Sequence, residues 1–256
     1  MKLYRTVLLA LFATTLFSCN KKEENQPTIS NTNGEIGFEF TNYAGNSELV
    51  MNTGKYVTAG NDTISITKFN YYISNIRFKK ADGSYYAEAS SYHLVKGDEG
   101  SSKHFHVETM PTGTYVSVSF MIGVDSEKNT SGAQKDALDV SNGMFWDWNS
   151  GYIMAKMEGT SPQSTATDKT FTYHIGGFSG ANSALRMVTL DFSSTPLIIN
   201  TGKEGTINIK ADALKWFAPN NISVASTNAI MMVSAKSKMI ADNYANMFSV
   251  TSIANE

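Results

Sequence analysis

Residues 35–41 read Glu-Ile-Gly-Phe-Glu-Phe-Thr, and this stretch decides the class of fold. Its three large apolar residues, Ile36, Phe38 and Phe40, alternate with small or polar ones. Because successive side chains of an extended chain point to opposite faces, the alternation places all three on one side. The stretch is therefore predicted to be a β-strand that is buried on one face.

The same period of two continues along the chain. Residues 69–78 form a β-rich run that leads into the turn Asp82-Gly83 and an aromatic return at Tyr85-Tyr86, as in a β-hairpin. About ten short strands separated by polar turns are typical of a β-sandwich. The other strands are predicted at residues 63–67, 115–122, 151–157, 170–175, 185–192 and 206–209.

Helical spacing is confined to residues 211–217 and 235–248. The second segment spaces five residues as one apolar stripe: Met239, Ile240, Tyr244, Met247 and Phe248. We therefore predict an all-β fold over residues 35–256. It is a single antiparallel β-sandwich with long inter-strand loops and short helical segments near the C-terminus.

The composition excludes several classes of protein. Of the 256 residues, 41% are hydrophobic and 17% charged, so the chain can bury a sizeable core and is not disordered throughout. A net charge of -2 gives no basic footprint for nucleic acid. A single cysteine, Cys19, excludes internal disulfides, a four-cysteine zinc site and a CxxC redox centre. Any metal must use histidine, methionine, carboxylate or amide ligands.

The N-terminus has the features of a lipoprotein signal peptide over residues 1–18. Lys2 and Arg5 precede an apolar run from Val7 to Phe17, and Cys19 follows directly after Ser18. The run is shorter than the roughly 20 residues that span a bilayer. We expect cleavage before Cys19 and lipid modification of its side chain.

Residues 19–34 are predicted to be a polar tether between the lipid and the domain, because residues 20–33 contain only one aliphatic residue, Ile29. The run Lys21-Lys22-Glu23-Glu24 resembles the charged export signals of surface lipoproteins in the Bacteroidota. We expect an outer membrane lipoprotein that is located either on the periplasmic face or on the cell surface.

The longest polar connection covers residues 125–151 and is rich in Asp and Asn. Loops of this length in compact domains are often functional. Hard oxygen ligands make calcium conceivable, although their spacing is not that of a DxDxDG loop. The alternative is a loop fixed by Asx turns and by burial of its aromatic residues.

Four sequence blocks occur in an order that resembles the MbnP-like copper-binding family, in particular its lipoprotein branch in the Bacteroidota. The resemblance spans roughly residues 35–217. The blocks are Tyr72-Ile73-Ser74-Asn75-Ile76-Arg77-Phe78, Phe120-Met121-Ile122-Gly123-Val124-Asp125 with Asn129 following, Asn142-Gly143-Met144-Phe145-Trp146-Asp147-Trp148-Asn149-Ser150-Gly151-Tyr152, and Phe171-Thr172-Tyr173-His174-Ile175-Gly176-Gly177.

This resemblance implies an extracytoplasmic β-sandwich that binds copper. It also implies that a tryptophan is oxidised to kynurenine by a partner di-haem peroxidase of the MauG type and then joins histidines as a ligand. Trp146, Trp148 and His174 fall inside the matched blocks, so they are the implied site. Thr130 stands after Asn129 where relatives often carry histidine.

The residues themselves offer a second location. His104 and His106 are two positions apart, so both imidazoles point to one side if residues 103–107 are extended. Neutral imidazoles suit copper. The alternative is a solvated pair that alternates with buried Phe105 and Val107, and His174 could equally be a hydrogen-bonded structural residue.

No sequence motif of a catalytic site occurs: GxSxG, HExxH, GxGxxG and the P-loop are all absent. We therefore expect a protein that is not an enzyme. The leading hypothesis is a lipid-anchored cell-envelope protein that binds copper for sequestration or uptake. The alternatives are a carbohydrate- or surface-binding module that presents Trp148, and a structural envelope lipoprotein without a ligand.

Overall fold

The computed structural model describes residues 33–132, 134–146 and 151–256. The predicted signal peptide, Cys19, most of the tether and Trp148 lie outside these residues. No helix in the described ranges is both long and apolar enough to cross a membrane.

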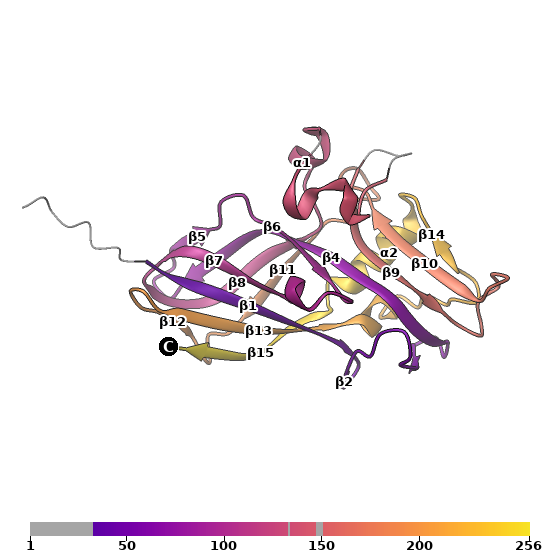
Figure 1. Cartoon of the computed structure of the whole chain (residues 1–256), viewed down its shortest axis with the longest axis horizontal. Coiled ribbons are helices and arrows are strands. Elements are labelled where there is room, and N and C mark those ends of the chain that lie inside the picture. The colour runs from indigo at the N-terminus through magenta and orange to yellow at the C-terminus, as the bar shows by residue number, and fades with distance from the viewer. Residues whose placement is uncertain (1–32, 133, 147–150) are drawn as a thin grey trace, which may run out of the picture. The chain divides into compact units, whose positions relative to one another are not determined.

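The described strands form two sheets (Figure 1). In the smaller sheet the order is β15–β13–β1–β2, and β7 pairs with the other side of β1. Its strands are β1 (Asn33–Ala44), β2 (Ser47–Glu48), β7 (His104–Pro111), β13 (Glu204–Asp212) and β15 (Phe248–Asn255).

The larger sheet has the order β11–β8–β4–β9–β10–β14, and four short strands pair at its margins. Its long members are β4 (Thr63–Lys80), β8 (Gly113–Ile122), β9 (Ile153–Thr160), β10 (Thr170–Gly176) and β11 (Arg186–Asp191). The four additional short strands are β3 (Tyr56–Val57), β5 (Tyr85–Ala87), β6 (Tyr92–Lys96) and β12 (Leu197–Ile199), and β14 (Ala229–Ile230) is the short strand that ends the order.

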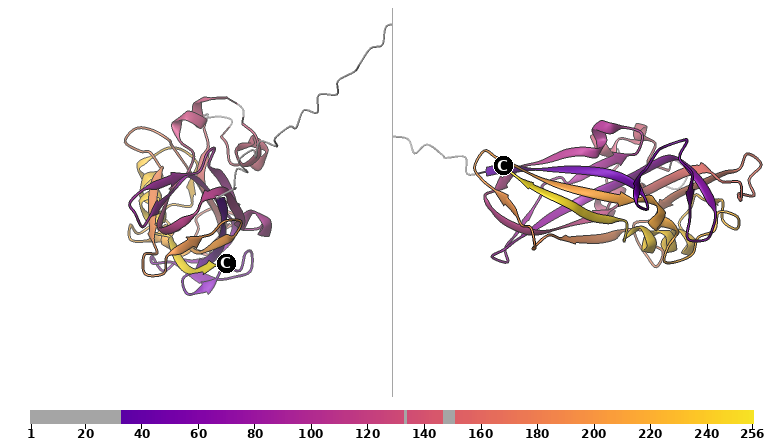
Figure 2. Two further views of the ribbon diagram at one scale, coloured as in Figure 1. Left: turned by 90° about the vertical axis from the view of Figure 1, so that its left-hand side faces the viewer. Right: turned by 90° about the horizontal axis from the view of Figure 1, so that it is seen from below.

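Figure 2 shows the strands of the two sheets from the end and from below. An aromatic core lies between the sheets. Phe38 of β1 is completely buried, and its ring centroid lies 5.9 Å from that of Phe78 on β4. Phe40 likewise contacts Tyr71 at 6.2 Å. Burial of such a side chain contributes about 1.5–3 kcal/mol. The predicted all-β sandwich is confirmed, and the alternation in residues 35–41 does face the core.

Among the described strands two pairs are parallel, which the prediction of an antiparallel sandwich missed. β1 runs parallel to β13, and β10 runs parallel to β14. Alternation of side chains is the same in both directions, so periodicity cannot distinguish them. Parallel neighbours need only a long connection between them, and every strand of the larger sheet except β14 lies between β1 and β13 in the sequence.

Helices are few, as expected, and shorter than predicted. The α-helices are α1 (Ser126–Thr130) and α2 (Ala235–Tyr244), and single 3-10 turns occupy Gly100–Lys103, Asp136–Leu138, Val140–Asn142 and Ala213–Phe217. Phe248 does not continue the stripe of α2; it begins β15 and pairs with Ala211. Met239 is 38% exposed, so it too lies outside the buried stripe.

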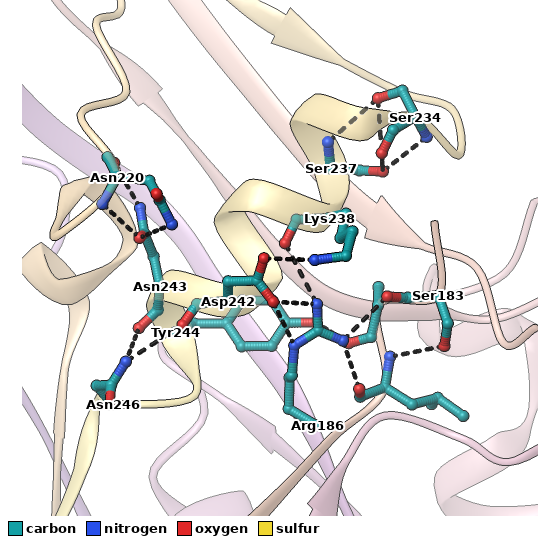
Figure 3. A network of polar contacts seen from close by, with 12 residues as sticks. Ser183, Arg186, Asn220, Ser234, Ser237, Lys238, Asp242, Asn243, Tyr244 and Asn246 are labelled. Carbon is teal, nitrogen blue, oxygen red and sulfur yellow. Dashed lines mark hydrogen bonds and ion pairs between the residues drawn. The ribbon is translucent and has the colours of Figure 1, made fainter. Parts of the chain in front are cut away.

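A polar network fixes α2 to the end of β11 (Figure 3). Nε and Nη2 of Arg186 donate to Oδ1 of Asp242 at 3.0 and 2.6 Å. The hydroxyl of Tyr244 donates to the carbonyl of Ala184 at 2.6 Å. Burial alone raises the pKa of Asp242, but hydrogen bonds from Lys238 and Arg186 outweigh burial, and the net result is a lowered pKa.

Candidate functional site

The first two family blocks meet at the junction of β4 and β8. The hydroxyl of Ser74 donates to the carbonyl of Gly123 at 2.7 Å. Nδ2 of Asn75 donates to Oδ2 of Asp125 at 2.9 Å. Asp125 also caps α1 by accepting from the backbone N–H of Lys128. The two blocks therefore hold each other through side-chain contacts of their own polar residues.

Asn129 connects the second block to the third. Its Nδ2 donates to the carbonyls of Val124 and Asp125 at 2.6 and 2.8 Å. Its Oδ1 accepts from the backbone N–H of Tyr152 at 2.8 Å. One amide side chain thus ties the start of the long loop to its end, which explains the presence of this residue in the motif without any ligand.

Trp146 connects the third block to the fourth. It is 4% exposed, and its indole lies so close to Gly176 that a Cβ there would be 2.5 Å from Cη2. A cavity of about 190 Å³ beside this ring is lined by Trp146, Gly151, Tyr152, Gly177, Phe178, Ser179 and Val233. Within the described ranges this lining contains no histidine or carboxylate, so the cavity offers no ordinary metal ligand.

His174 lies on β10, two positions before Gly176, but it already has a partner. Its Nε2 is 2.7 Å from Oε1 of Glu158, and its side chain is 12% exposed. The hydrogen bond from His174 lowers the pKa of the Glu158 carboxyl. Among the described residues His174 joins no group of three metal-ligating side chains. This geometry favours the structural interpretation of His174.

Polar side chains of the long loop form hydrogen bonds within the loop itself. Oδ1 of Asp139 accepts from the backbone N–H of Ser141 at 2.8 Å, and Nδ2 of Asn142 donates to the carbonyl of Asp136 at 2.9 Å. These are caps and turns of the loop itself. They favour a loop that is fixed by Asx turns, which was the alternative to a calcium site. Asp147 and Asn149 lie outside the described residues.

His104 and His106 converge on the outer face of the smaller sheet. They lie at the start of β7, paired with Glu39 and Gly37 of β1. Phe105 between them points the other way and stacks on Phe38 with ring centroids 5.0 Å apart. The condition of an extended segment is met from His104 onward, whereas Lys103 belongs to the preceding 3-10 turn. The two Nε2 atoms face each other at 2.5 Å, with ring planes at 80°.

Carboxylates stand behind both imidazoles. Oε1 of Glu39 is 2.6 Å from Nδ1 of His104, and Oε2 of Glu204 is 3.9 Å from Nδ1 of His106. Both Nδ1 atoms are buried, and neither forms a hydrogen bond of acceptable geometry. Gly37 makes room for this arrangement, since a Cβ there would overlap Oε1 of Glu204.

One group of three potential ligands occurs in the described ranges, and it includes His106. Ligand atoms of Glu35, His106 and Glu204 all lie within 4.8 Å of one another. The sequence prediction missed Glu35, Glu39 and Glu204. Their only signal is their outward phase in strands 33–44 and 204–212, and the register that brings them beside His104 and His106 is set by pairing of distant segments.

Comparisons with known proteins agree on one family. The MbnP family model matches residues 33–233. MbnP from Methylosinus trichosporium has a similar structure, with a TM-score of 0.56 and 13% sequence identity, over 79% of this chain and 82% of that chain. No curated protein matches the chain. Because the family model covers most of the sequence, the chain belongs to the MbnP family.

Proposed function

We propose that this protein is a cell-envelope copper-binding protein that is not an enzyme and that holds Cu(I) between His104 and His106. Membership of the MbnP family supports copper as the metal. The observation that carries the site is the convergence of the two Nε2 atoms at 2.5 Å on an outer sheet face. One Nε2–H donates to the other Nε2 across this distance, and a Cu(I) ion would take the place of that shared proton as the link between the two imidazoles.

The donor set fits Cu(I) in type and in number. Cu(I) accepts two or three soft or borderline ligands, and imidazole nitrogen is among them. A metal-bound histidine usually donates its other ring N–H to a carboxylate, which fixes the tautomer. The carboxylate of Glu39 lies 2.6 Å from Nδ1 of His104, and that of Glu204 lies 3.9 Å from Nδ1 of His106. Neither hydrogen bond is formed with the rings in their present orientation, so both rings must turn to use these partners.

The separation of the two rings must widen when the ion binds. Metal–imidazole bonds are about 2.0 Å long, so two opposed nitrogen atoms would stand about 4 Å apart. The side chains of His104 and His106 are 39% and 34% exposed, so solvent rather than packed core borders the rings and leaves them free to part.

The same proposal includes lipidation of Cys19, an outer membrane location and oxidation of a tryptophan by a MauG-type di-haem peroxidase. Trp146 is buried against Gly176, so little of its ring is open to an oxidising partner. Intact mass and metal content of the natively expressed protein test these parts. Oxidation at Trp146 or Trp148 would show as a mass shift in the tryptic peptide that contains both.

The site is tested by Cu(I) affinity, measured without oxygen by competition with a chromogenic Cu(I) chelator. We expect His104→Ala and His106→Ala each to weaken binding on the order of 100-fold, because one of two ligands is lost. His174→Ala and His93→Ala are matched controls and should leave the affinity within about threefold. If copper binding is lost in His174→Ala and in none of the other variants, the site lies at His174 and the assignment is overturned.

A further inference from the structure

We infer that the same sheet face carries a second metal position, which takes a divalent transition-metal cation on Glu35, Glu204 and Nδ1 of His106. This position deepens the proposed function and rests on it only because the two positions share His106. It lies on the opposite edge of the His106 ring from His104, since Nε2 faces His104 and Nδ1 faces Glu204.

The backbone places the three ligands without any adjustment of the strands. Glu35 and Glu204 are direct partners in the parallel β1–β13 pair, so their side chains leave the sheet side by side. His106 comes from β7 on the other side of β1, across Gly37. Thr206 donates to Oε1 of Glu204 at 3.3 Å and orients that carboxylate. The ligand atoms are consequently within 4.8 Å of one another.

The charges on this face call for a cation. Like charges directly opposite each other on neighbouring strands destabilise a sheet. In the described ranges neither Glu35 nor Glu204 forms an ion pair with lysine or arginine. Glu35 and Glu108 line a cavity of about 310 Å³ together with Lys203, whose single positive charge is the only one in that lining.

The ligand chemistry selects the class of metal. One imidazole nitrogen and two carboxylates suit a divalent ion of borderline softness such as Zn²⁺. Carboxylates serve Cu(I) poorly, and hard Mg²⁺ or Ca²⁺ would gain little from an imidazole. Solvent in the adjoining cavity can complete the coordination shell.

Sharing His106 makes the two positions compete. A neutral imidazole has one lone pair, on either Nε2 or Nδ1, so it can serve the Cu(I) position or the divalent position. Occupation of both would require the ring to lose its second proton. We therefore expect Zn²⁺ to weaken Cu(I) binding, and Cu(I) to weaken Zn²⁺ binding by the same factor.

The test measures Zn²⁺ and Cu(I) separately on the full chain, each by competition with a chromogenic chelator, with circular dichroism as the folding control. Glu35→Gln should weaken Zn²⁺ binding at least about tenfold and leave Cu(I) within about threefold. His104→Ala should do the reverse, and His106→Ala should weaken both. Glu108→Gln is the matched control, because Glu108 lines the same cavity outside the ligand group.

Two outcomes overturn the inference: Zn²⁺ affinity that is the same in Glu35→Gln as in the parent, or an equal loss in Glu108→Gln. Failure of the proposed function looks different. In that case the parent binds no Cu(I), while the Zn²⁺ pattern of the Glu35→Gln and His106→Ala variants persists.

Discussion

Gly176 offers a sharp test of how the family motifs pack, because only its missing side chain admits Trp146. We expect Gly176→Ala to destabilise the protein. A Cβ at this position would lie 2.5 Å from Cη2 of Trp146, a distance that real Cβ atoms essentially never show. The backbone at Gly176 is not in the left-handed region, so alanine brings no conformational strain of its own. The whole cost is therefore steric.

The magnitude follows from the burial of the ring. Trp146 is 4% exposed and packs against the end of β10 at Gly176, so the indole cannot move into solvent without losing its contacts. Overpacking of this kind typically costs about 1–3 kcal/mol. For a domain of this size, about 2 kcal/mol corresponds to a fall in Tm of roughly 4–8 °C.

Urea unfolding followed by tryptophan fluorescence and circular dichroism measures this cost, and a double-mutant cycle identifies its source. In a Trp146→Leu background the large ring is gone, so Gly176→Ala should cost less than about 0.5 kcal/mol. Gly100→Ala is the matched control, because no atom lies within 4 Å of its added Cβ. The reasoning is refuted if Gly176→Ala costs the same with and without the indole.

Three further predictions concern other parts of the chain. Asn129→Ala should lower the free energy of unfolding by about 2–3 kcal/mol in urea titrations, since three hydrogen bonds are lost, one of which joins the second block to the third; a cost near zero would contradict the role assigned to this amide. Asp242→Asn should cost about 1–2 kcal/mol at pH 7, discounted for the 38% exposure of the side chain. The pKa of Asp242 is lowered on folding, so its contribution is present above the unfolded pKa of 3.8 and is lost as pH falls through the folded value; an equal difference between parent and variant at pH 2.5 and pH 7 would argue against it. Cys19→Ala should move the natively expressed protein from the membrane to the soluble fraction, and a soluble parent would disprove the lipid anchor.

The strands were predictable where burial alternates along one segment. Residues 35–41, 115–122 and 170–175 each have apolar residues at every second position, and each lies in a strand with that face in the core. Strand β15 was not predicted, because its Ser-, Thr- and Asn-containing sequence covers an edge and buries little apart from Phe248. Its direction and partner depend on β13, which no local pattern records.

The candidate site divides in the same way. The outward phase of His104 and His106 follows from a local period and was predictable. The carboxylates behind them were not, since Glu39 and Glu204 come from strands far apart in the sequence, and only the register of β1 against β7 and β13 aligns them. His174 lies in a matched block, yet its contact with Glu158 favours a structural role, and that contact depends on the pairing of β9 with β10.

The position of β1 also governs the order in which this protein can fold. β1 is the first strand of the described chain, yet it lies inside the smaller sheet, with Ile36 paired to Gly205 and Val107 on its two sides. A chain emerging N-terminus first must therefore keep Ile36, Phe38 and Phe40 unpaired on one side until residues 204–212 arrive. Contacts so distant in sequence make folding slow and expose an open strand edge meanwhile. A chain that is truncated before residue 204 is expected to keep this strand edge unpaired and prone to aggregation. The smaller sheet can therefore form only after residues 204–212 have been synthesised.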